Sequence, residues 1–109
     1  MLKTSGIAAH LEAALSGIPG IVSAFIFGSI AAGTENAESD VDLLVLGSAG
    51  LRKISAALRG VSDSLGREIN PHCLTVEEWR QRLTGDDAFV RRVAAEPKLW
   101  LKGGPDVPR

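Results

Sequence analysis

The sequence predicts an α/β (α+β) fold, a small mixed sheet flanked by helices. Segments with strand character alternate with segments of helical periodicity along the 109 residues, and this length favours one domain, residues 1–109. Hydrophobic residues make up 45% of the chain and charged residues 23%, which is typical of a globular protein and excludes a disordered one. A chain of this size can bury a core without disulfides or metal staples.

The first half of the chain is predicted to form one helix and two strands. Residues 4–16 carry apolar side chains at helical spacing. Residues 21–27 (IVSAFIF) are an apolar, β-rich run that Gly28 ends, and residues 40–46 (DVDLLVL) are a second such run. The polar residues 33–39 between the two runs are predicted as a loop.

The middle of the chain predicts a helix followed by a third strand. Residues 50–65 predict a helix, and Gly60 weakens the periodicity and is the point at which the helix could break. Residues 67–74 (REINPHCL) have strand character. Because Pro71 cannot donate a hydrogen bond within a sheet, this strand should lie at an edge or contain a bulge.

The last third of the chain predicts two short helices and no fourth strand. The sequence TVEE is a capping box and predicts a helix over residues 76–83. Asp86 or Asp87 is expected to begin a second helix. The apolar residues 99–101 follow it, and residues 103–109 are expected to be a frayed tail.

Composition excludes several classes of protein. The net charge of −1 argues against a dedicated nucleic-acid binder, which is usually strongly basic. The single cysteine, Cys73, excludes an intrachain disulfide and a multi-cysteine zinc site. No apolar stretch approaches the ~20 residues that cross a bilayer, and His10 and Glu12 interrupt any signal-peptide core. We therefore expect a cytoplasmic protein without a membrane partner.

Two aspartates on one predicted strand require an explanation. Asp40 and Asp42 alternate along the strand, so their side chains point to the same face with Cα atoms roughly 6.5 Å apart. At a carboxylate separation of about 5 Å and an effective dielectric of about 20, their repulsion is about 3 kcal/mol, a large fraction of a small domain's stability. A divalent cation would offset this repulsion, and Mg²⁺ prefers carboxylate oxygens, waters and substrate phosphates as ligands. The pair therefore predicts a metal site.

The Gly28-Ser29 pair supplies a complementary phosphate site. Glycine at the end of a buried strand lets the backbone turn and approach a ligand closely. Ser29 offers a hydroxyl and a backbone N–H, and a short helix over residues 29–33 would add further N–H groups that favour an anion. Amides on one side and a metal on the other suit phosphoryl or nucleotidyl transfer.

These residues carry a specific resemblance. Gly28-Ser29, ten residues and then Asp40-Val41-Asp42 resemble the signature of minimal nucleotidyltransferases of the DNA polymerase β superfamily. The segment S-D-V-D-L-L-V also resembles the S-D-x-D-L-L-V strand of that family. The resemblance implies a polymerase β-type nucleotidyltransferase core that uses ATP, or another nucleoside triphosphate, and Mg²⁺ in a one- or two-metal site. It implies that Gly28 and Ser29 bind the triphosphate and that the catalytic Asp40 and Asp42 ligate metal.

Two positions depart from the family pattern. The family often has arginine in a G-S-x-A-R-G sequence, where this chain has Ala32. The family's third carboxylate lies on the strand after the long helix, and the alignment places Asn70 there. Asparagine is neutral and a poor general base. Glu68 lies two residues earlier on the same strand face, and we include it as a candidate catalytic acid in place of Asn70.

The resemblance also implies an enzyme, a transferase of phosphorus-containing groups, and an acceptor hydroxyl on a protein. In the family this partner is often the helical HEPN protein of a toxin–antitoxin pair. Because 109 residues leave little room for a separate acceptor-binding domain, we expect a partner chain or a homodimer seam. The alternative is a catalytically impaired nucleotide-binding or antitoxin-like interaction module, favoured by Asn70 and Ala32. A third interpretation, an α/β domain without a ligand, treats the aspartates as a solvated strand start.

Other chemically suggestive residues have simpler interpretations. His72 and Cys73 are adjacent, but neighbours on a strand point to opposite faces, so they are not expected to form a metal pair. Trp79 and Trp100 could stack on a base, yet large aromatic residues in small domains usually pack in the core. None of these four residues is therefore a site candidate from sequence.

Overall fold

The computed structural model describes residues 3–33 and 40–103. The predicted loop beyond Gly33 and the predicted tail beyond Gly103 lie outside these ranges. The elements, in chain order, are α1 Lys3–Ser16, β1 Ile21–Phe27, α2 Ser29–Ala32, β2 Val41–Gly47, α3 Leu51–Leu65, β3 Ile69–Leu74, α4 Val76–Thr84, α5 Ala88–Ala95 and β4 Leu99–Lys102.

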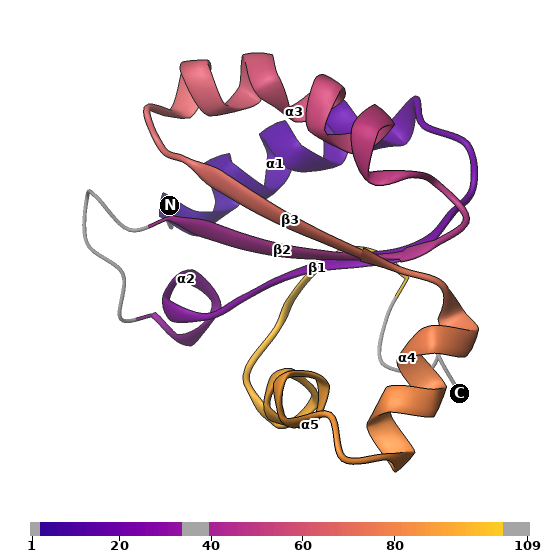
Figure 1. Cartoon of the computed structure of the whole chain (residues 1–109). Helices are drawn as coiled ribbons and strands as arrows, with labels where there is room; N and C mark the ends of the chain where they lie inside the picture. Colours follow the sequence, from indigo (N-terminus) through magenta and orange to yellow (C-terminus); the bar gives the residue numbers. More distant parts are fainter. Residues whose placement is uncertain (1–2, 34–39, 104–109) are drawn as a thin grey trace.

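Four strands form one mixed sheet in the order β3-β2-β1-β4. β1 pairs antiparallel with β2 and with β4, whereas β2 and β3 run parallel and are joined through α3. Helices α1 and α3 cover one face of the sheet, and α4 and α5 cover the other (Figure 1). The prediction of a mixed sheet flanked by helices is therefore confirmed.

The strand β4 corrects the sequence-based prediction of three strands. Residues 99–102 form a short edge strand, and Trp100 pairs with Phe25 at the centre of β1. The segment is only four residues long and follows Pro97, so its pattern alone does not distinguish it from a tail. Helix α3 forms over Leu51–Leu65 as predicted, and it continues without a break through Gly60, which lies on its exposed side.

Alternation along the strands divides the core into two layers. Val41, Leu43 and Val45 pack against α1 and α3. Leu44 and Leu46 pack against α4 and α5 on the opposite face. Residues of β2 with even numbers therefore face α4 and α5, which places the Asp42 side chain on that side of the sheet.

β3 is an edge strand, as its proline predicts. The Val41 N–H donates to the Glu68 carbonyl at 2.8 Å, which fixes the phase of the parallel ladder. In this phase the backbone groups of Ile69, Pro71 and Cys73 point away from β2. Pro71 therefore occupies a position that needs no hydrogen bond inside the sheet, and its missing N–H weakens the edge as a template for another strand.

Helix α4 begins with the predicted capping box. The Thr75 hydroxyl accepts from the Glu78 N–H at 3.0 Å, and the Glu78 carboxylate accepts from the Thr75 N–H at 2.8 Å. We expect Thr75→Ala to lower the free energy of unfolding by about 1 kcal/mol. Urea denaturation measures this change, and Thr84→Ala at the other end of the helix is the control, with an effect within about 0.5 kcal/mol. Equal losses in both variants would contradict the assignment.

None of the helices within residues 3–33 and 40–103 is a candidate membrane span. Each of these helices is too short or too polar to cross a bilayer.

Candidate functional site

The C-terminal end of β1 meets the N-terminal ends of β2 and β3 at one end of the sheet. Asp42 pairs with Phe27, the last residue of β1, on one side and with Asn70 of β3 on the other. Gly28 and α2 follow directly after Phe27, so α2 lies at the end of the sheet where β2 begins (Figure 1). The fold thus brings together segments that are separated by more than forty residues in sequence.

Gly28 lies directly against the Asp42 carboxylate. A Cβ atom added at Gly28 would come within 2.5 Å of Asp42 Oδ2, and the Gly28 backbone has a φ of 77°, which other residues rarely adopt. The Asp42 side chain is half-buried between this backbone and its neighbours in the sheet. A ligand that reaches Asp42 would therefore also contact the Gly28 backbone.

Helix α2 continues from this glycine for a single turn. The Ala32 N–H donates to the Gly28 carbonyl at 3.0 Å, and Ser29, the first residue of the helix, is half-buried. Ala32 is exposed at the position where the resembled family often has arginine. With four residues the helix has little dipole, so an anion here would depend on the individual N–H groups and the Ser29 hydroxyl.

Asn70 lies beside both aspartates. It is the register partner of Asp42, and its Nδ2 donates to Asp40 Oδ2 at 3.4 Å. This is a long hydrogen bond between an exposed carboxylate and a half-buried amide. Asn70, which the alignment with the family puts in the position of the third carboxylate, therefore does lie beside the two aspartates.

Glu68 lies one residue before β3, and its side chain is exposed. Within residues 3–33 and 40–103, no three or more His, Cys, Asp or Glu side chains form a group that could hold a metal. Asp40, Asp42 and Glu68 are thus not assembled as a three-carboxylate site. The role of Glu68 as a substitute acid stays a prediction.

The two aspartates nevertheless suit one kind of metal. Mg²⁺ is commonly bound through one or two carboxylates, with waters and substrate phosphates as its other ligands. Asp40 is exposed and Asp42 is half-buried where β2 begins, so both residues are at least partly accessible to water and to a phosphate. The donor set therefore fits a magnesium ion that arrives with a phosphorylated substrate.

His72 and Cys73 lie on opposite faces of the sheet, as expected. Cys73 packs against the α1 and α3 layer, and burial raises the pKa of its thiol. The His72 ring instead contacts the rings of Phe27 and Phe89, with centroid distances of 5.9 and 5.1 Å. This ring cluster lies on the same face of the sheet as Asp42. Sequence reasoning that considers His72 only as a metal partner of Cys73 does not find it. The sequence does contain a signal for this placement, because His72 follows Asn70 by two residues on one strand and therefore points to the same face.

The two tryptophans belong to the hydrophobic packing around Phe25. Trp79 is 4% exposed, and its ring meets Phe25 edge-on at 6.1 Å. Trp100 meets the same ring at 5.0 Å. Trp79 therefore lies in the core as expected, and the half-buried Trp100 packs against that core.

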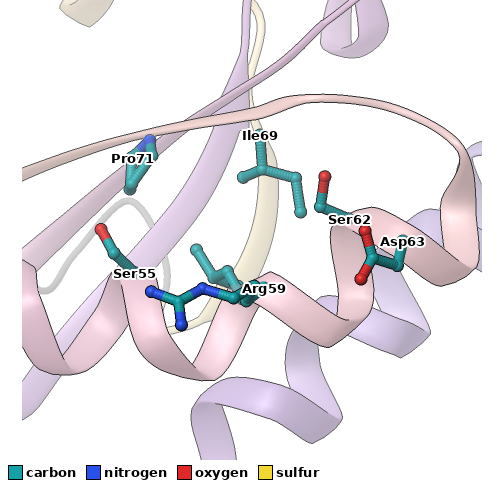
Figure 2. Close-up of a pocket in the computed structure, with 7 residues that line it drawn as sticks. Ser55, Arg59, Ser62, Asp63, Ile69 and Pro71 are labelled. Carbon is teal, nitrogen blue, oxygen red and sulfur yellow. The ribbon is translucent and has the colours of Figure 1, made fainter.

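A separate cleft of about 230 Å³ lies between α3 and β3. Figure 2 shows Arg59, Ser62 and Asp63 on the helix, with Ile69 and Pro71 on the strand opposite. Ile69 and Pro71 face α3, on the side of the sheet away from Asn70. This cleft is therefore not part of the site at the aspartates.

Replacement of Gly28 tests the contact with Asp42. We expect Gly28→Ala to weaken binding of magnesium–ATP at least about tenfold, because the new Cβ displaces the carboxylate, and to cost about 1–3 kcal/mol of stability through backbone strain. Gly33→Ala is the matched control, since Gly33 also has a positive φ of 79°, whereas no atom of residues 3–33 and 40–103 lies within 4 Å of its added Cβ. Isothermal titration measures the affinities, and comparable weakening in both variants would refute the role of this contact.

Comparison with known proteins identifies a family whose model covers the candidate site. The family model for polymerase β nucleotidyltransferases matches residues 10–72, more than half of the chain, and includes Gly28, Asp40, Asp42 and Asn70. No protein with a curated description matches the sequence.

Several solved structures share the fold at low sequence identity. A toxin–antitoxin crystal structure with AMP-PNP aligns with a TM-score of 0.66 and 16% identity, covering 93% of this chain and 77% of the other. A double Asp-to-Glu mutant of the toxin–antitoxin MntA-HpeT gives a TM-score of 0.57 at 17% identity, covering 95% and 76%. A Tyr-to-Ala mutant of the same pair gives 0.56 at 19%, covering 99% and 78%. At these identities the likeness concerns the fold.

Proposed function

Because this chain belongs to the polymerase β nucleotidyltransferase family, we propose that it transfers a nucleoside monophosphate from ATP, or another nucleoside triphosphate, to an acceptor hydroxyl. In this reaction the acceptor oxygen forms a bond to the α-phosphorus, the bond to the β-phosphate breaks, and pyrophosphate leaves with those electrons. The observation that carries the proposal is the contact between the Gly28 backbone and the Asp42 carboxylate. It supports a single site for a phosphate and a cation.

The residues around this contact have distinct proposed roles. Gly28 and Ser29 would hold the triphosphate through backbone N–H groups and the serine hydroxyl. Asp40 and Asp42 would hold Mg²⁺, in a one- or two-metal arrangement, which would supply positive charge against the polyphosphate. The acceptor hydroxyl loses its proton during transfer, and Glu68 is the candidate carboxylate for that proton.

The acceptor is proposed to lie on a partner protein, in an antitoxin-type arrangement. Support comes from the solved neighbours, which are described as toxin–antitoxin structures, one of them with AMP-PNP. A helical HEPN-type partner is the first candidate, and a second copy of this chain is the other.

One observation favours a second function, a nucleotide-binding or antitoxin-like module with impaired catalysis. Asn70 lies beside both aspartates and its amide donates a hydrogen bond to Asp40, so a neutral donor lies where the resemblance puts the third carboxylate. A site with two acids can hold one metal ion, whereas a two-metal mechanism usually employs more oxygen ligands.

Titration with magnesium–ATP followed by a transfer assay separates these functions. The protein is mixed with nucleotide carrying label in its α-phosphate, together with each candidate acceptor protein, and labelled protein is measured. Binding and transfer support the enzyme, with loss of transfer in Glu68→Gln if that carboxylate accepts the proton. Binding without transfer supports the module. A failure to bind magnesium–ATP would refute both.

A further inference from the structure

We propose that His72 and Phe89 form a shelf on which the base of the bound nucleotide stacks, with the Arg92 guanidinium over the Phe89 ring. The proposal rests on the proposed function, because it concerns the nucleotide held at Gly28 and Asp42. It adds a base-binding subsite made of residues from β3 and α5, outside the segments that carry the aspartates.

The shelf lies on the same face of the sheet as the carboxylates. Asp42 pairs with Asn70, and His72 is the next residue of β3 whose side chain points to that face. From the spacing of strands and residues, the Cα atoms of Asp42 and His72 lie roughly 8 Å apart. Phe27, which contacts the His72 ring, is itself the register partner of Asp42 on β1. The shelf therefore lies next to Asp42, because β1 and β3, which carry Phe27 and His72, both pair with β2.

The rings are held in place, and one of them is accessible. Phe27 is 3% exposed and anchors the cluster, Phe89 is half-buried, and His72 is exposed. The imidazole is inclined at 42° to Phe89 and at 50° to Phe27, and both rings contact it. An exposed planar ring fixed by packing is suited to stack on a second planar group at little entropic cost.

Arg92 extends this surface. Its guanidinium carbon lies 5.8 Å from the centre of the Phe89 ring, and its Nε is 3.4 Å from the Glu96 carboxylate, which orients it. A guanidinium over an aromatic ring is a common neighbour of stacked bases, because both cation–π and planar contacts are available to the base. The rings of the two tryptophans instead pack around Phe25.

This chemistry recognises a nucleoside rather than a particular base. Every base has a π-face, and stacking by itself discriminates weakly among bases. The shelf should therefore distinguish ATP from inorganic tripolyphosphate, which has the same phosphate chain without ribose or base.

The test compares magnesium–ATP with magnesium–tripolyphosphate by isothermal titration on the whole chain. We expect His72→Ala to weaken ATP binding about tenfold and to leave tripolyphosphate binding unchanged. His72→Phe keeps a ring at this position and should retain most of the ATP affinity. His10→Ala, at the other histidine of the chain, exposed on α1, is the control and should change neither affinity.

Several outcomes would overturn the shelf. They are unchanged ATP binding in His72→Ala, a loss shared equally with tripolyphosphate, or equal affinities of the unmodified protein for the two ligands. In the last case the phosphate and metal site still stands. If the unmodified protein binds neither ligand, the proposed function fails and the shelf fails with it. Circular dichroism verifies that each variant is folded.

Discussion

Asp42→Asn should reduce nucleotide transfer by about 10²–10³-fold without unfolding the protein. The substitution preserves the shape of the side chain and removes its charge, and Asp42 is the carboxylate that lies against Gly28. If this carboxylate helps to hold Mg²⁺ beside the triphosphate, the neutral amide loses most of its attraction for the ion. Magnesium–ATP affinity should fall together with transfer.

Stability gives an independent measurement on the same variant. Removal of one of two neighbouring negative charges relieves repulsion, so Asp42→Asn should be at least as stable as the unmodified protein in the absence of Mg²⁺. The stabilisation that Mg²⁺ and ATP confer on the unmodified protein in thermal unfolding should largely disappear. Asp63→Asn, an exposed aspartate on α3 next to the separate cleft, is the control for charge and should affect none of these quantities.

Unchanged transfer and unchanged magnesium–ATP affinity in Asp42→Asn would contradict the site. An increase in stability without any loss of function would favour the third interpretation, an α/β domain in which the aspartates bind no ligand.

The strands and helices of the first ninety-five residues follow closely from sequence. The run IVSAFIF is β1 to the residue, and the TVEE capping box marks the start of α4. These elements are defined by local signals, namely apolar periodicity and caps. β4 is different, because its four residues become a strand only through pairing with the centre of β1, and no local pattern specifies that partner.

The same distinction applies to the candidate site. The spacing from Gly28 to Asp42 predicts that two strand ends meet, and the sheet does bring these residues into contact. The hydrogen bond from Asn70 to Asp40 depends on the parallel register of β2 and β3, and the contact of His72 with Phe89 depends on where α5 packs. Register and packing are properties of the assembled fold, so sequence alone identified Asn70 by alignment and missed the ring cluster.

Asn70→Asp should raise nucleotide transfer by about 10²-fold if the absence of a third carboxylate limits catalysis. The side chain keeps its size, and its oxygen would lie where Asn70 Nδ2 now donates to Asp40. A carboxylate there can ligate metal or accept the proton of the acceptor hydroxyl, which the amide does poorly. The change thus restores the acid that the family pattern has at this position.

The variant should also lose stability when Mg²⁺ is absent. A carboxylate in place of the amide faces Asp40 at about 3.4 Å and replaces a hydrogen bond with repulsion. Two charges at about 4 Å repel by about 1–4 kcal/mol between the dielectric of water and that near a protein surface. Mg²⁺ should recover this loss, so the ion should raise the thermal midpoint of Asn70→Asp more than that of the unmodified protein.

Glu68→Gln, alone and combined with Asn70→Asp, determines which acid serves the reaction. If Glu68 substitutes for the missing carboxylate, Glu68→Gln abolishes transfer in the unmodified background and has little effect once residue 70 is Asp. If the chain is an impaired module, the unmodified protein shows little transfer and Asn70→Asp creates it. An Asn70→Asp variant that binds magnesium–ATP more tightly yet transfers no faster would show that the third carboxylate is not what limits catalysis.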